Sequence, residues 1–211
     1  MSKALKGFMK APLTSQLGLV VVIVYAFVAL AAPVLAPFGE TEIVGDQYEP
    51  WGSEFLLGTD NIGRDMLTRL IYGARNTVGI AFVITCLAFA IGGFTGMLAA
   101  TLGGWIDQIL SRIVDILMAI PGLVFVLLVL SFFGTAIPVL IMVIAIFEST
   151  RVFRLTRAVA MNVEVMDYVE ISKLRGESMW WIVWCEILPN TAAPLVAEFG
   201  VRFTYTFLFI T

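Results

Sequence analysis

The sequence predicts an all-α, polytopic membrane protein, in which a bundle of helices crosses a bilayer. Sixty per cent of the 211 residues are hydrophobic, against roughly 45–50% in a soluble globular domain. Charged residues make up only 14% and they cluster, so that long windows at 77–104 and 116–147 contain none. Clustering of this kind outlines membrane spans.

Five spans are expected, because a hydrocarbon core of about 30 Å needs about 20 residues of helix. The first apolar run is too long to be the core of a cleaved signal peptide, which has about 7–15 residues. The window at 116–147 is too long for one helix, and we divide it near 133–136, where Gly134 interrupts it. The expected spans are 17–36, 77–104, 116 to about 133, 137 to about 157, and 191–211.

The N-terminus is expected on the inner side, because Lys and Arg accumulate in the inner connections of membrane proteins. With this orientation the inner side holds nine of them and the outer side three. The inner nine are Lys3, Lys6, Lys10, Arg112, Arg151, Arg154, Arg157, Lys173 and Arg175, and the outer three are Arg64, Arg69 and Arg75. We therefore expect the chain to consist of an inner segment 1–16, a first helix 17–36, an outer loop 37–76 and a membrane core 77–211.

Within the outer loop 37–76, helical spacing follows Asp65, with apolar residues at Leu67, Leu70 and Ile71. Apolar residues three and four apart lie on one face of a helix. We therefore expect a short helix that lies on the outer membrane surface.

Composition makes several classes of function improbable. The net charge of −3 and the lack of a basic tract argue against a nucleic-acid partner. The chain has no histidine, the commonest metal ligand and general base, so we expect no catalytic or metal site. It also lacks a phosphate-binding loop of the Gly-x-x-x-x-Gly-Lys-Ser/Thr type, so no cofactor is expected in this chain.

The inner loop at about 158–190 is polar and is the place where a soluble partner would dock. Gly176 can adopt the left-handed conformation that ends one short helix and turns the chain into the next. Pro189 suits a helix start, where its missing N–H would be unpaired in any case. The alternative is an interfacial loop with no special role.

This inner loop resembles the EAA loop of ABC importer permeases. The resemblance rests on Asp167, Tyr168 and Glu170, on Gly176 six residues later, and on Leu188-Pro189-Asn190. Upstream, Arg154 and Arg157 are similar to the Arg-x-x-Arg of the peptide-permease branch. In that family the loop forms a coupling helix that sits in a groove of the ATPase subunit. The chain departs from the family pattern at Ile171, Ser172, Arg175 and Glu186.

A second resemblance lies in the outer loop, which is similar to the Leu-Gly-Thr-Asp-x-x-Gly-Arg-Asp signature of the dipeptide, oligopeptide and nickel branch of that family. Its residues could cap turns and satisfy local backbone groups, or they could contact a solute-binding protein. The matching residues are Gly58, Thr59, Asp60, Gly63, Arg64, Asp65, Arg69 and Arg75.

The resemblance implies the type I ABC importer transmembrane fold in a bacterial inner membrane. Its implied partners are a second homologous permease, two ATP-binding cassette subunits that hold ATP and Mg, a periplasmic solute-binding protein and membrane lipid. It also implies a sixth span, which is absent here. Because the chain ends at Thr211 in apolar sequence without a polar cap, we expect that the sequence is incomplete.

Two further features of the core are assigned from the residues alone. Glu198 and Arg202 are four apart on one helical face and are either a structural ion pair or part of a translocation path. Gly92 and Gly96 form a Gly-x-x-x-Gly spacing that allows close helix packing. One competing function is an ion-coupled carrier or channel without an ATPase, but the spans from Leu17 to Phe147 contain no charged residue in their interiors that could couple transport to an ion. A third candidate is a membrane-anchored assembly factor with no pore.

Overall fold

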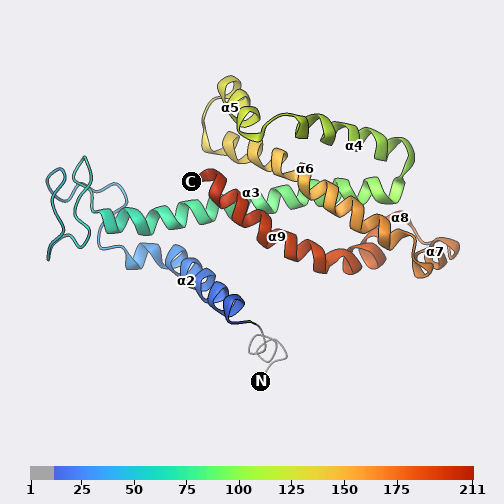
Figure 1. Ribbon diagram of the computed structural model, residues 1–211, viewed down its shortest axis with the longest axis horizontal. Helices are drawn as coiled ribbons and strands as arrows, with labels where there is room; N and C mark the ends of the chain where they lie inside the picture. Colours follow the sequence, from blue (N-terminus) through green and yellow to red (C-terminus); the bar gives the residue numbers. More distant parts are fainter. Residues whose placement is uncertain (1–11) are drawn as a thin grey trace. The chain divides into compact units, whose positions relative to one another are not determined.

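The computed structural model describes residues 12–211, which form helices joined by turns (Figure 1). The predicted all-α class is confirmed. The chain divides into two compact units, one that ends at Gly79 and one that begins at Ile80. Lys3, Lys6 and Lys10, on which part of the expected orientation depends, lie outside the described residues.

The first unit contains the helix α2, Leu13–Leu35, and a loop that leads into α3. α2 begins after Pro12, and most of its large apolar side chains are exposed. A helix that is apolar all round suits a lipid environment, so α2 fits the expected first span.

The helix α3, Met66–Leu102, is continuous over 37 residues. The separate surface helix expected after Asp65 is therefore wrong, because Leu67, Leu70 and Ile71 lie in the first turns of α3. The arginines at 69 and 75 suggested that the membrane-spanning helix begins after them, but a helix can continue past the edge of the hydrocarbon core. At about 1.5 Å per residue α3 is about 55 Å long and exceeds a core of about 30 Å.

The second unit contains the rest of α3 and six further helices, in which α6 packs against α4, α5 and α9. Its apolar core includes Ile84 of α3, Val126 of α5 and Ile144 of α6. The helices are α4 (Gly104–Ala119), α5 (Gly122–Phe133), α6 (Ile137–Glu164), α7 (Asp167–Leu174), α8 (Met179–Trp181) and α9 (Leu188–Ile210), with the π-helix η1 (Ile182–Ile187) between α8 and α9.

Three of the described helical runs are long and apolar enough to cross a membrane, namely α2, α3 and the continuous run Met179–Ile210. The pair α4 and α5 would be a fourth, although it bends by 93° at Pro121. The sequence led us to expect five spans. The difference arises at α6, which is long enough but has Glu148, Arg151 and Arg154 in its middle.

Close packing of α3 on α6 depends on two glycines. A Cβ atom at Gly92 would lie 2.3 Å from the carbonyl oxygen of Ser149, and one at Gly96 would lie 2.8 Å from that of Phe153. Neither distance is compatible with a side chain at those positions. The predicted packing role of this Gly-x-x-x-Gly pair is confirmed.

Candidate functional site

The connection between α6 and α9 is a short helix followed by a glycine turn. α7 has acidic residues in its first turn and Lys173 in its last, an arrangement that suits the helix dipole. Gly176 has φ +78° and a Cβ there would meet no neighbour, so backbone conformation and not space requires glycine. The Ser178 side chain then accepts a hydrogen bond from the Trp181 N–H at the start of α8. The predicted break at Gly176 is confirmed.

α7 has a buried face and an exposed face. Val169 is fully buried in a cluster with residues of α3, α6 and η1, namely Ala100, Ala160, Val163, Ile182 and Ile187. On the other face Glu170, Ile171 and Leu174 are exposed, and Leu174 is 80% accessible. A helix fixed on one side and exposed on the other can transmit a force from a docked partner to the helices beneath it.

Three of the four departures from the family pattern lie together in the structure. The Ser172 hydroxyl oxygen lies 3.2 Å from a carboxylate oxygen of Glu186 in η1, and the Arg175 guanidinium donates to the same hydroxyl at 3.3 Å. Together they join α7 to η1 with polar contacts. The sequence marked these positions as departures, but only the fold shows that they contact one another.

The remaining residues of this motif have separate local roles. Asp167 begins α7 and Tyr168 is exposed on it. Leu188 and Pro189 begin α9, where proline is tolerated, and the Asn190 side-chain amide donates to the Glu186 carbonyl at 2.6 Å.

The two arginines upstream of α7 contact α4. Arg154 forms an ion pair with Asp115 at 2.6 Å, and Arg157 forms a bidentate pair with Asp107. A bidentate arginine–carboxylate pair has a defined geometry and is among the stronger charged hydrogen bonds. The structure therefore places Arg154 and Arg157 at the α4–α6 contact, apart from the exposed face of α7.

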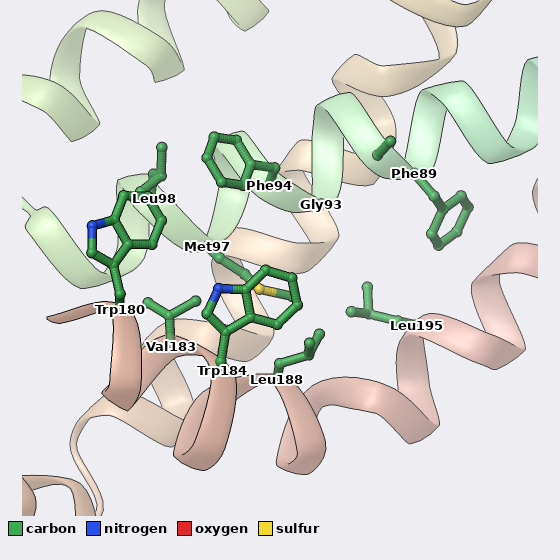
Figure 2. Close-up of a pocket in the computed structure, with 11 residues that line it drawn as sticks. Phe89, Gly93, Phe94, Met97, Leu98, Trp180, Val183, Trp184, Leu188 and Leu195 are labelled. Carbon is green, nitrogen blue, oxygen red and sulfur yellow. The ribbon is translucent and has the colours of Figure 1, made fainter. Parts of the chain in front are cut away.

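An apolar pocket of about 430 Å³ lies between α3 and the run from α8 to α9 (Figure 2). Met97 of α3 faces Trp180 and Trp184 in this view, and Leu195 lies toward the Phe89 end. No sequence pattern predicted it, because its two walls are far apart in the chain.

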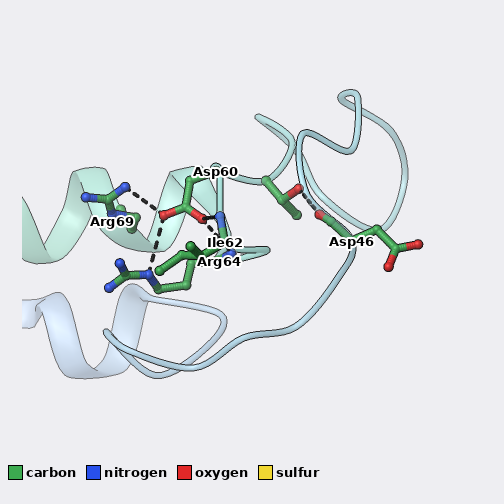
Figure 3. Close-up of polar contacts among 6 residues, drawn as sticks. Asp46, Asp60, Ile62, Arg64 and Arg69 are labelled. Atoms are coloured by element: carbon green, nitrogen blue, oxygen red, sulfur yellow. Dashed lines mark hydrogen bonds and ion pairs between the residues drawn. The ribbon is translucent and has the colours of Figure 1, made fainter.

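In the loop between α2 and α3, the Asp60 side chain is surrounded by hydrogen-bond donors (Figure 3). It accepts from the N–H groups of Arg64 and Ile62 at 3.0 and 2.8 Å and from the Arg69 guanidinium at 2.7 Å. The Arg64 N–H has the largest effect in holding the pKa of Asp60 below 3.8, and the Ile62 N–H and the charges of Arg64 and Arg69 add to it. Burial opposes this shift.

The rest of the outer signature also makes local contacts. Thr59 accepts a hydrogen bond from the Glu49 N–H at 2.8 Å, and Asp65 accepts one from the Thr68 N–H at 2.7 Å and so caps α3. Gly58 and Gly63 have φ +74° and +78°. These contacts fit the structural interpretation of the signature. Arg75 is exposed and forms no ion pair within residues 12–211.

Four charged side chains form a chain between α6 and α9. The Glu148 carboxylate lies 2.7 Å from Arg151 on its own helix and 3.6 Å from Arg202 on α9, and Arg202 also pairs with Glu198. Glu148 is only 6% accessible. The predicted pairing of Glu198 with Arg202 is confirmed. Sequence reasoning missed Glu148, because it lies at the edge of an uncharged window.

Comparison with known proteins places this arrangement among transport proteins. Residues 91–211 match the family described as the binding-protein-dependent transport system inner membrane component. The chain is 36% identical to the dipeptide transport system permease protein DppC of Haemophilus influenzae, over 86% of this chain and 64% of that protein. It is 37% identical to the oligopeptide transport system permease protein OppC of Lactococcus lactis subsp. cremoris, over 72% of this chain and 53% of that protein.

A third relative is named for a different solute. The glutathione transport system permease protein GsiD of Pectobacterium atrosepticum is 30% identical, over 69% of this chain and 48% of that protein. The chain thus spans about half to two thirds of the length of these relatives.

Proposed function

Because this chain belongs to the family of inner membrane components of binding-protein-dependent transport systems, we propose that it is a permease subunit of an ATP-driven importer of peptides or a related small solute. The relatives named for dipeptides, oligopeptides and glutathione support this solute class. The proposal includes a bacterial inner-membrane location with the N-terminus in the cytoplasm.

The observation that supports coupling most strongly is the two-faced α7. Its exposed face, with Glu170, Ile171 and Leu174, is available to a separate ATPase subunit. Its buried residue Val169 packs against α3, α6 and η1, so displacement of α7 would move those helices. ATP and Mg would be bound by two such partner subunits, and closure of the ATPase pair would shift α7 as a rigid body.

The other proposed partners are a second homologous permease, which would complete the pathway, and a periplasmic solute-binding protein that delivers the solute. The loop between α2 and α3 is the proposed outer contact for that protein. Its signature residues stabilise the loop itself, and the exposed Tyr48 and Trp51 are available for contact.

The test is charge reversal on α7 in the assembled transporter. Glu170→Arg is expected to leave membrane insertion intact and to uncouple ATP hydrolysis from uptake, and Gly176→Pro should do the same, because proline cannot adopt φ +78°. The matched control is Arg112→Glu, which reverses an exposed charge on α4, outside both α7 and the proposed outer contact. Normal coupled uptake with both α7 variants would refute the assignment.

The side of the membrane on which α7 lies can be tested separately with Glu170→Cys in a chain whose two native cysteines are replaced by alanine. A membrane-impermeant maleimide should label this cysteine only after the cells are opened. Labelling of sealed cells from outside would place α7 on the wrong side of the membrane for an ATPase.

A second candidate function is an ion-coupled carrier or channel that needs no ATPase. The chain of Glu148, which is buried, and Arg202 and Glu198, which are partly buried, favours it, because ionisable groups within membranes often mark ion pathways. Uptake into vesicles that contain no ATPase subunit and no ATP would support this candidate and remove the first.

A further inference from the structure

The apolar pocket beside η1 shares only Leu188 with the motif of the inner loop, and its lining suits a hydrocarbon chain. Its walls are Phe94 and Met97 of α3 on one side, and Trp180, Trp184 and Leu188 on the other. The rings of Phe94 and Trp180 are stacked, with centroids 6.1 Å apart and planes 14° apart. The two indole N–H groups are the sole polar side-chain groups among its lining residues, so a charged solute would be bound poorly.

The position of the pocket in the membrane follows from its walls. α3 and the run Met179–Ile210 are both apolar enough to cross a membrane. The apolar surface continues from the pocket lining onto exposed side chains, since Phe94 and Trp184 are 48% and 59% accessible and Val196, beside Leu195, is 72% accessible. The pocket is therefore continuous with exposed apolar surface on two helical runs that are apolar enough to cross a membrane.

The tryptophans indicate the level in the membrane at which the pocket lies. Three of the five tryptophans of the chain fall within residues 180–184. Tryptophan is enriched where hydrocarbon meets head groups, because its ring is apolar and its N–H remains hydrated. The wall formed by Trp180 and Trp184 thus fits the boundary between acyl chains and head groups.

We propose that this pocket holds an acyl chain of a membrane phospholipid, which lies between α3 and η1 with its head group at the level of the tryptophan N–H groups. An apolar cavity of about 150 Å³ already takes up a small hydrocarbon in place of water, and this pocket is larger. π-Helical turns such as η1 occur frequently at functional sites. The bound acyl chain stabilises the segment that joins α7 to α9.

The lining offers a way to fill the pocket without disturbing its walls. Gly93 lines it, and a Cβ atom at this position would meet no atom within 4 Å. Gly93→Phe therefore places a ring in the space that the acyl chain would occupy. Gly200→Phe is the matched control, because a Cβ at Gly200 of α9 is also free and Gly200 is outside the pocket lining.

The test uses tryptophan fluorescence of the full chain in detergent, with Trp51, Trp105 and Trp181 replaced by phenylalanine. A phosphatidylcholine with brominated acyl chains should quench Trp180 and Trp184 saturably, and unbrominated phosphatidylcholine should reverse the quenching. Gly93→Phe should raise the lipid concentration for half-maximal quenching about tenfold, the expected effect of excluding about two methylene groups. Gly200→Phe should leave it unchanged.

Quenching that does not saturate, or that is the same in Gly93→Phe, would show only surface contact with lipid and would overturn the proposal. If Gly93→Phe does not fold, Ala90→Phe places a ring at another lining residue of the same pocket. Quenching that is lost when a second permease chain is present would show that protein, not lipid, fills the pocket in the assembly, and would also overturn it. The assay needs no transport, so its result is independent of the function proposed above.

Discussion

Two clusters of the molecule each place a buried carboxylate between two arginines, but they stabilise it differently. Asp60, in the loop between α2 and α3, pairs with Arg64 and Arg69 and also accepts two backbone N–H groups. Glu148 of α6 pairs with Arg151 and with Arg202 of α9, and its second carboxylate oxygen has no hydrogen-bond donor within residues 12–211. The first carboxylate is stabilised mainly by local backbone and the second by side chains of two helices.

This difference predicts how each cluster responds to loss of a charge. A buried ion pair that loses one partner leaves a charge without compensation, which costs far more than losing an exposed pair. In the cluster of Asp60, Arg64 and Arg69, here called the outer cluster, the two backbone N–H donors remain after one arginine is removed. In the α6–α9 cluster Arg151 still pairs with Glu148 after Arg202 is removed, but Glu198 is left without an ion-pair partner within residues 12–211.

The largest expected effect is therefore that of Arg202→Leu. It leaves Glu198 without an ion-pair partner within residues 12–211 and removes the more distant of the two arginines beside Glu148, and we expect a loss of about 3 kcal/mol in the free energy of unfolding. The control is Arg151→Leu, whose side chain is 41% accessible, with an expected loss of about 1 kcal/mol or less. Unfolding of the purified chain in detergent would measure both, and equal losses would contradict the distinction.

The sequence predicted the contacts that lie within one turn or one helix. Glu198 and Arg202 are four apart, Gly176 ends α7, and the signature after Gly58 forms local turns. It did not predict Glu148 with Arg202, or Asp107 with Arg157, because which helices meet depends on packing along their whole length. The continuity of α3 was also missed, since charged residues that mark the end of a span do not end a helix.

The second effect concerns the position of α6 beside Glu148. A Cβ at Gly92 would lie 2.3 Å from the carbonyl oxygen of Ser149, the residue after Glu148. Gly92→Ala is expected to push α6 away and to destabilise the chain by about 1–3 kcal/mol. Gly93→Ala, one residue along and free of neighbours, should be neutral or slightly stabilising because alanine favours helix. Thermal unfolding of the two variants separates them, and similar midpoints would count against the close approach.

The third effect tests whether the backbone conformation at Gly63 stabilises the outer cluster more than its arginines do. Gly63 has φ +78°, and a Cβ there would lie 2.1 Å from the Gly45 carbonyl oxygen. Gly63→Ala should cost about 1–2 kcal/mol for the left-handed conformation alone. Protease cleavage of the loop should increase more in Gly63→Ala than in Arg69→Met. The reverse order would mean that the arginine and not the backbone maintains the loop.

The smallest effect is the pH dependence of the outer cluster, which arises from the lowered pKa of Asp60. The Arg64 N–H is its largest cause, followed among the stabilising groups by the Ile62 N–H and the two arginine charges. Because the unfolded loop takes up a proton more readily than the folded one, the stabilisation by Asp60 is complete well above pH 3.8 and is lost as the pH falls below it. Trp51 fluorescence can follow loosening of the loop. Asp60→Asn should abolish the loosening of the loop at low pH, and Asp46→Asn should leave it unchanged. If the loop of Asp60→Asn still loosens at the same pH, another titratable group causes the effect.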